Sequence, residues 1–315
     1  MIGIDLGGTK TAVGLVSSRG EVAELNSWPT QASDGADAVV ERLTALVRKA
    51  AGAGGHRLPG VLGVGLATPG VVDSASGTVS YATPALPGWT GLALGPRLAA
   101  STGLPVIVHN DGHATAWGEW ALGAASRVSD AVVVTLGTGV GGGIIAGSRL
   151  VYGHFGGAGR IGHLSVEANG RPCWCGARGC LEQYASGSAI ARDAQAAIDG
   201  GAQSALRSLP RPVVAADVVA AARAGDALAT ALLTEAGQYL GTALVSLVNV
   251  LSPQVVVIAG GLAEAGDLLL EPAEAVLGDR LPPALRAGVE VRVSTLGSRA
   301  AVAGAGLLAW EGLRR

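Results

Sequence analysis

The chain has 315 residues, of which 49% are hydrophobic and 15% are charged, and its formal net charge is −2. That length allows about two domains, and the apolar content excludes a disordered chain, while fifty glycines without a triplet period exclude collagen. Because the net charge is small and no basic run occurs, the sequence gives no support for binding to nucleic acid or to an anionic membrane surface.

The first part of the chain predicts strands joined by glycine turns. Strands are expected at residues 2–6, 11–18 and 21–27, with turns at Gly7-Gly8 and Arg19-Gly20. A helix is expected from residue 36 to about 51, where apolar residues recur at helical intervals. A buried strand within 61–70 runs into a glycine-proline loop, and a short strand at 105–108 precedes a helix at 114–122.

The rest of the chain predicts mainly helices, at about 186–207, 214–224, 226–250 and 298–313, with one strand at 254–258. Strands that alternate with helices indicate an α/β fold. Because no low-complexity linker separates the halves, we expect the boundary between two lobes near residue 112. The lobes would then be 1–112 and 113–297, with the last helix, about 298–315, packing back on the first lobe.

An internal repeat supports two similar lobes. A shift of 130 residues lays IDLGGTKTAVGLVSSR over VTLGTGVGGGIIAGSR without a gap, so that Leu6 meets Leu136 and Gly7 meets Gly137. Each copy reads as a strand, a glycine turn and a second strand, which predicts the same hairpin at the start of both lobes. Chance similarity in a glycine-rich chain is the alternative.

The two glycine turns are candidate phosphate sites, because backbone N–H groups without a Cβ beside them can surround an anion. The first turn, DLGGTK, adds a hydroxyl at Thr9, a charge at Lys10 and a carboxylate at Asp5 that can hold Mg²⁺. Lys10 is one of only two lysines, against twenty arginines, which hints at a need for a compact charge. The second turn, LGTGVGGG, offers Thr138 and bare backbone. A plain hairpin with a solvated lysine is the alternative, and the P-loop spacing is absent.

All three cysteines lie in one short segment. His163, Cys173, Cys175 and Cys180 follow the pattern H-x9-C-x-C-x4-C, and three thiolates with one imidazole suit a closed tetrahedral Zn²⁺ site. This pattern does not fit a disulfide-stapled secreted domain.

The opening MIGIDLGGTK lacks a signal peptide, and no apolar stretch reaches the ~20 residues of a membrane span, so a cytoplasmic protein is expected.

Six motifs together resemble one known family. DLGGTK, GVGLATPG, HND before a helix ending in WGE, LGTGVGGG, GH…CxCGxxGCLExxxSG and VVIAGGLA occur in the order seen in the ROK family of bacterial glucokinases, other sugar kinases and sugar-responsive repressors. The resemblance spans almost the whole chain. It implies the actin-like ATPase fold, which is ribonuclease H-like, with ATP and a sugar bound in a cleft between two lobes. A homodimer is also implied.

The resemblance also implies roles for individual residues. Asp111, which by itself reads as a helix cap, matches the base that accepts the proton of the attacking hydroxyl. The implied sugar-binding residues are Asn110, Gly70, Arg160, His163 and Glu182. The implied nucleotide residues are Asp5, Gly7, Gly8, Thr9, Lys10, Gly137, Thr138, Gly139, Gly260 and Gly261. The metal would be structural and would hold the loop that carries His163 and Glu182 against the sugar.

Three positions depart from the family pattern. Arg160 stands where the family has a Glu that contacts sugar hydroxyls, and Ala85 stands where relatives often have Asn. A guanidinium only donates hydrogen bonds, so Arg160 would suit a substrate with an acceptor there, such as a modified sugar or a sugar-derived cyclitol. Alternatively, Arg160 points to solvent. His113 stands where relatives commonly have Asn, and no role is assigned to it.

The sequence therefore predicts an ATP- and Mg²⁺-dependent kinase that phosphorylates the primary hydroxyl of a hexose, with glucose as the first candidate. A kinase for a modified sugar or cyclitol is the alternative. A repressor is disfavoured, since the phosphate motif begins at residue 2 and leaves no room for a helix-turn-helix. Polyphosphate as the donor stays open, although VVIAGGLA resembles the adenosine-side motif of the family.

Overall fold

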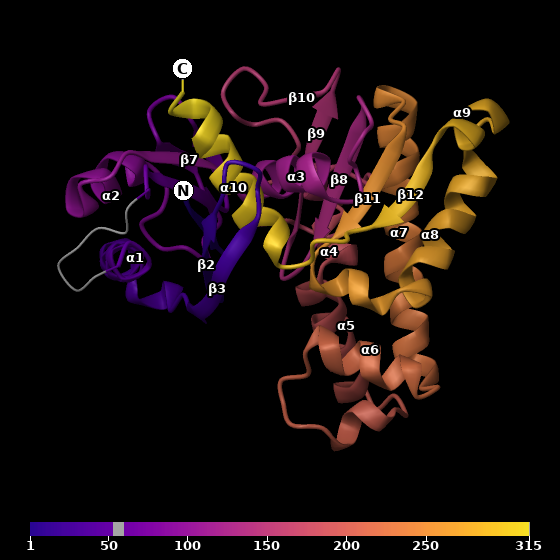
Figure 1. Ribbon diagram of the computed structural model, residues 1–315. Helices are drawn as coiled ribbons and strands as arrows, with labels where there is room; N and C mark the ends of the chain where they lie inside the picture. The colour runs from indigo at the N-terminus through magenta and orange to yellow at the C-terminus, as the bar shows by residue number, and fades with distance from the viewer. Residues whose placement is uncertain (53–59, 315) are drawn as a thin grey trace. The chain divides into compact units, whose positions relative to one another are not determined.

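The computed structural model describes residues 1–52 and 60–314 (Figure 1). The chain forms two compact units. The first unit contains Met1–Ser129, Gly142–Gly159 and Thr295–Arg315, and the second contains Asp130–Gly141 and Arg160–Ser294. The lobe boundary near residue 112 stays a prediction.

The first unit is built on a five-stranded sheet with the order β3-β2-β1-β4-β7. The strands are β1 (Ile2–Leu6), β2 (Lys10–Val16), β3 (Val22–Pro29), β4 (Val64–Thr68) and β7 (Val106–Asn110). The first three strands form antiparallel pairs, whereas β4 pairs in parallel with β1 and with β7. Nearly every residue of β1 and β4 is buried, as expected for strands covered on both faces. The three predicted N-terminal strands are thereby confirmed.

Helices pack around this sheet: α1 (Ala36–Ala50), α2 (Leu94–Thr102), α3 (Asp111–Leu122) and α10 (Arg299–Gly312). A short hairpin of β5 (Val71–Asp73) and β6 (Thr78–Tyr81) follows β4, and a 3-10 turn, η1 (Ala32–Asp34), precedes α1. Helix α10, yellow in Figure 1, lies directly on the sheet, because a Cβ on Gly3 would lie 2.3 Å from the Val302 carbonyl oxygen. Likewise a Cβ on Gly65 would lie 2.0 Å from the Ala305 oxygen, so glycine permits this close packing.

The other five-stranded sheet has the order β10-β9-β8-β11-β12. Its strands are β8 (Ala131–Leu136), β9 (Val140–Ala146), β10 (Arg149–Leu150), β11 (Val255–Ala259) and β12 (Glu290–Val293). Strand β11 pairs in parallel with β8 and with β12. All five residues of β11 are buried, which explains its unbroken apolar sequence VVVIA.

The helices of the second unit are α4 (Glu182–Ala185), α5 (Gly187–Asp199), α6 (Ala215–Arg223), α7 (Ala227–Leu251), α8 (Asp267–Arg280) and α9 (Pro283–Gly288). Three 3-10 turns also occur: η2 (Ile161–His163) precedes α4, η3 (Ala205–Ser208) lies between α5 and α6, and η4 (Gly261–Ala265) lies between β11 and α8. Among the described residues, no helix is long and apolar enough to cross a membrane.

The predicted repeat is present in the structure. Strands β1 and β2 begin at Ile2 and Lys10, and β8 and β9 begin at Ala131 and Val140, so the second strands are 130 residues apart. In the first turn the Gly7 N–H donates to the Lys10 carbonyl oxygen at 2.9 Å, and in the second the Gly137 N–H donates to the Gly139 oxygen at 2.9 Å.

Several predicted boundaries were wrong. The helix expected at 186–207 ends at Asp199, since Gly200 and Gly201 follow and Gly201 has a positive φ. The helix expected from 114 begins at Asp111, because Asn110 caps it. The region expected to hold one strand besides its helices also contains β12.

Candidate active site

The Asn110-Asp111 pair lies where β7 ends and α3 begins. Asn110 is the N-cap: its side-chain oxygen accepts the His113 N–H at 3.1 Å, and its amide donates to the Gly70 carbonyl oxygen at 2.8 Å and to Asp111 Oδ1 at 2.9 Å. Asp111 Oδ1 also accepts the Gly112 N–H at 2.9 Å. These bonds fix the orientation of the half-buried Asp111 carboxylate.

The loop after β4 supports this pair from one side. Gly70 has a φ of +112°, and a Cβ there would lie 2.4 Å from the Tyr81 carbonyl oxygen, so only glycine fits. Its carbonyl oxygen is the one that accepts from Asn110. Ala85 lies in the exposed turn after β6, where its N–H donates to the Thr83 hydroxyl at 3.3 Å.

Asp5 and Asp111 influence each other electrostatically within the first unit. Burial raises the pKa of Asp5 to about 7; the negative charge of Asp111 acts in the same direction, and the positive charge of Lys10 opposes it. The structure thus brings together three of the predicted residues, two carboxylates and a lysine. Such a set can hold a divalent cation and a phosphate once Asp5 is ionised.

The first glycine turn is held by a residue that the sequence analysis missed. The Thr30 hydroxyl donates to the Gly7 carbonyl oxygen at 2.7 Å, and the Thr30 N–H donates to the Thr9 carbonyl oxygen at 2.9 Å. Thr11 and Thr30 also share a hydroxyl–hydroxyl hydrogen bond of 2.8 Å. Gly8, Thr9 and Lys10 remain exposed at the tip of the turn, as a phosphate site requires.

Two buried histidines lie next to the Asn110-Asp111 pair. His113 Nε2 lies 2.9 Å from the Ala158 carbonyl oxygen, and its ring contacts Tyr152 edge-on. Burial, with a smaller contribution from His113, lowers the pKa of His109 to about 4, so its ring is neutral at physiological pH. His113, for which the sequence predicted no role, therefore ties α3 to the segment after β10.

The second glycine turn borders a cavity within the second unit. The Gly187 N–H donates to the Gly137 carbonyl oxygen at 2.8 Å, and the Ser188 N–H approaches the Thr138 oxygen at 3.4 Å. The cavity measures about 780 Å³, which is the size of a site for a cofactor-sized molecule. It is lined by Gly137, Thr138, Gly187, Ser188, Ala191, Val214, Ala215, Ala216, Val219, Ala220, Arg223, Gly261, Leu262 and Glu264.

Three of the predicted nucleotide residues, Gly137, Thr138 and Gly261, thus line one cavity. Gly260 stands just before it, with a φ of +90° and no room for a Cβ, which would lie 2.3 Å from the Leu136 carbonyl oxygen. Gly139 faces Glu182 instead. The other predicted nucleotide residues, Asp5 and the turn that ends at Lys10, belong to the first unit.

Glu182, Arg160 and His163 lie close together in the second unit. Glu182 Oε1 accepts the Trp174 indole N–H at 2.6 Å, and Oε2 accepts the Val140 N–H at 2.9 Å. The Arg160 guanidinium lies 6.0 Å from the centre of the Trp174 ring. Burial lowers the pKa of His163; the charge of Arg160 adds to this effect and that of Glu182 opposes it. Trp174 is a contact residue that the sequence analysis missed.

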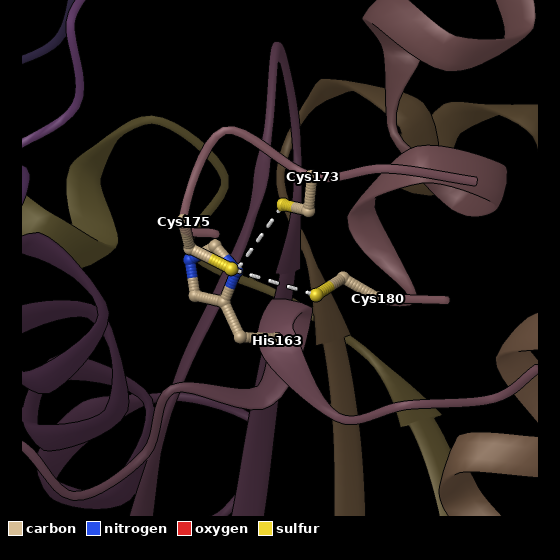
Figure 2. A group of neighbouring side chains, drawn as sticks. All are labelled: His163, Cys173, Cys175 and Cys180. Carbon is tan, nitrogen blue, oxygen red and sulfur yellow. Dashed lines mark hydrogen bonds between the residues drawn. The ribbon is translucent and has the colours of Figure 1, made fainter. Parts of the chain in front are cut away.

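The four predicted metal ligands come together (Figure 2). One nitrogen of His163 and the sulfur atoms of Cys173, Cys175 and Cys180 all lie within 4.8 Å of one another. Cys173 Sγ is 3.7 Å from His163 Nδ1, and Cys175 Sγ is 3.7 Å from Cys180 Sγ. The cysteines form no disulfide. Three sulfur atoms and one imidazole nitrogen that converge in this way fit Zn²⁺ in a closed, four-coordinate site.

A family comparison covers nearly the whole chain, since residues 1–311 match the ROK family. The chain belongs to the ROK family. This ROK protein is 36% identical over 311 residues to a glucokinase from Halalkalibacterium halodurans, with 98% of this chain and 94% of the relative covered. It is 34% identical to a glucokinase from Streptomyces coelicolor, with 98% and 97% covered.

A solved structure agrees with this assignment. The ROK glucokinase from Streptomyces griseus in complex with glucose and AMPPNP is similar to this ROK protein with a TM-score of 0.87 and 34% identity, and 99% of each chain is covered. The two mixed five-stranded sheets accordingly represent the actin-like ATPase fold, as the sequence predicted.

Proposed function

We propose that this ROK protein is an ATP- and Mg²⁺-dependent kinase that transfers the γ-phosphoryl group to the primary hydroxyl of a hexose. Glucose is the first candidate for the acceptor. The observation that carries the proposal is the Asp111 carboxylate, which Asn110 and Gly112 hold at the start of α3 beside Asp5 and Lys10. The glucokinases to which the chain is similar over its length support glucose as the acceptor and ATP as the donor.

The chemistry follows from the positions of these groups. Asp111 accepts the proton of the attacking hydroxyl as its oxygen bonds to the γ-phosphorus and the bond to ADP breaks. Asn110 orients the sugar, and Lys10 with the N–H groups of the first turn binds phosphate oxygens. Asp5 would hold Mg²⁺, which supplies positive charge to the phosphates when bound. The second-unit cavity would take the adenosine part of the nucleotide.

The thiol and imidazole cluster would hold a structural Zn²⁺. Its four ligands would fill the coordination shell, so the ion would not activate water or polarise a substrate. Zinc would instead fix the loop between η2 and α4, and Arg160, His163 and Glu182 lie close together at the ends of this loop. In this proposal His163 and Glu182 contact the sugar or support its binding.

Arg160 favours a second candidate within the same reaction. Among the residues that the structure describes, its half-buried guanidinium forms no ion pair with a carboxylate, and it faces the Trp174 ring. An acceptor molecule with a keto, acyl or carboxylate oxygen would satisfy it, whereas a hydroxyl would satisfy it less well. A modified sugar or a sugar-derived cyclitol is therefore the alternative substrate.

The test is ADP release from ATP and Mg²⁺ with D-glucose as the acceptor, with the Asp111→Asn variant as the blank. Asp111-dependent turnover with glucose supports the first candidate. Turnover only with amino, acylated, keto or cyclitol analogues supports the second. Replacing ATP by polyphosphate in the same assay identifies the donor, and no turnover with any acceptor contradicts the kinase proposal and favours a sugar-sensing role.

The homodimer implied by the family resemblance stays a prediction. Light scattering behind a sizing column measures it directly, since the chain mass is 31.0 kDa. The cytoplasmic location also stays a prediction, and cell fractionation tests it.

A further inference from the structure

Trp174 links Glu182 to the four candidate metal ligands His163, Cys173, Cys175 and Cys180, which we call the metal cluster. It stands between the two cluster residues Cys173 and Cys175, so its backbone position depends on theirs. Its ring meets the His163 imidazole edge-on, with 5.0 Å between ring centres, and its indole N–H donates to Glu182 Oε1 at 2.6 Å. A donor to a carboxylate forms a strong, directional bond, so the indole restricts where the Glu182 side chain can lie.

Glu182 in turn holds the second glycine turn. Its other oxygen, Oε2, accepts the Val140 N–H at 2.9 Å, directly after that turn. Gly139 approaches the same oxygen so closely that a Cβ there would lie 2.5 Å from it. One carboxylate thus connects the indole of Trp174 to the backbone at residues 139–140.

The turn is also held by the start of α5, five residues after Glu182. The Gly187 N–H donates to the Gly137 carbonyl oxygen at 2.8 Å. Gly137, Thr138, Gly187 and Ser188 then line the 780 Å³ cavity. All of these residues belong to the second unit, so the connection from the metal cluster to the cavity runs within one compact body.

We propose that Trp174 is a positioning residue through which the metal cluster orders the glycine turn at residues 137–139 and thereby sets the affinity for adenine nucleotide. The proposal rests on the proposed function, which assigns that cavity to the nucleotide. With the indole bond in place, the turn is held ready for the ligand. Without it, Glu182 gains freedom, and nucleotide binding must order the turn at a cost in affinity.

The test is the variant Trp174→Phe, which keeps an aromatic ring at this position and removes the indole N–H together with part of the ring system. Isothermal titration with ADP, in the absence of sugar, should show binding about five- to tenfold weaker than in the wild type, which is the size of effect expected from the net contribution of one ordinary hydrogen bond. The zinc content, measured by mass spectrometry, should stay at the wild-type level. Hydrogen exchange of the Val140 amide should be faster.

The matched control is Trp120→Phe. The Trp120 indole N–H donates to the Val128 carbonyl oxygen at 2.8 Å in the first unit, so this variant also loses one indole hydrogen bond. It should bind ADP as the wild type does. Equal weakening in both variants would show a general loss of stability and overturn the proposal.

Metal removal gives a second, independent measurement. A chelator should weaken ADP binding in the wild type and have a smaller effect in Trp174→Phe, because the connection is already broken there. Unchanged ADP affinity in the zinc-loaded variant or in metal-free wild type would overturn the coupling and leave the kinase proposal intact. A wild type that binds no ADP and phosphorylates no acceptor would overturn both.

Discussion

At the scale of single residues, Asp111 tests the proposed reaction most directly. An asparagine at this position has the same shape, and its side-chain oxygen can still accept from Asn110 and Gly112. We therefore expect Asp111→Asn to fold and to bind the sugar with nearly unchanged affinity while kcat falls by roughly 10²–10⁴-fold, because the proton acceptor is lost. Steady-state kinetics and sugar titration measure the two quantities. Wild-type turnover in this variant would remove Asp111 from the mechanism.

The raised pKa of Asp5 determines how the activity should change with pH. Its pKa is raised to about 7, so the free protein takes up a proton there as the pH falls below neutrality, and a protonated carboxyl holds Mg²⁺ poorly. We expect kcat/KM for MgATP to decrease below about pH 7, and excess Mg²⁺ to move this decrease to lower pH. A pH profile that is flat between 6 and 8 at low Mg²⁺ would contradict the assignment.

The same pKa shift has an effect on stability with the opposite sign. The folded protein keeps a proton on Asp5 that the unfolded chain releases near the ordinary aspartate pKa of about 3.9. The stabilising contribution of Asp5 is therefore full below that value and is lost as the pH rises to about 7. Urea unfolding between pH 4 and 8 should show a smaller pH dependence in Asp5→Asn than in the wild type.

At the scale of elements, helices α3 and α10 of the first unit cross in close contact. A Cβ on Gly304 would lie 1.8 Å from the Ala114 carbonyl oxygen, and one on Gly118 would lie 2.2 Å from the Ala300 oxygen. We expect Gly304→Ala to lower the free energy of unfolding by about 1–3 kcal/mol, because the helices must separate. Urea denaturation measures the change.

The control for this variant is Gly278→Ala in α8. A Cβ there meets nothing within 4 Å, and alanine favours the helix over glycine, so this variant should be neutral or slightly stabilising. Destabilisation of the same size in both variants would contradict the explanation by close packing.

The elements also show what the sequence could predict. The strand–glycine–strand pattern is local, so both hairpins and the 130-residue repeat were predictable. Helix α2 was missed because Gly95-Pro96 near its start is typical of a turn, and α8 because Pro272 interrupts its pattern. The metal cluster was predictable from spacing alone, whereas the contact of Trp174 with Glu182 depends on how the loop folds over α4 and leaves no sequence signal.

At the scale of the whole molecule, the metal cluster should stabilise the second unit when zinc is bound. Its four donors join residue 163 to a loop that ends at residue 180, so a bound ion cross-links this segment. We expect about one zinc per chain and a fall in Tm of roughly 5–10 °C after chelation. Elemental analysis measures the zinc content and calorimetry measures Tm. The variant Cys180→Ser should show the same fall in Tm as chelation. Protein that is free of zinc as isolated and equally stable would contradict the site.

Helix α10 has a consequence for how the protein is made. Because α10 covers the sheet of the first unit at Gly3 and Gly65, strands β1 and β4 are synthesised long before the helix that covers them. The second unit is complete in the nascent chain once residue 294 has left the ribosome. We therefore expect the second unit to be able to fold before the first is complete, whereas N-terminal domains usually fold first during synthesis. A premature stop that removes only α10 would expose the sheet at the opposite end of the sequence and would leave the metal-bearing unit whole.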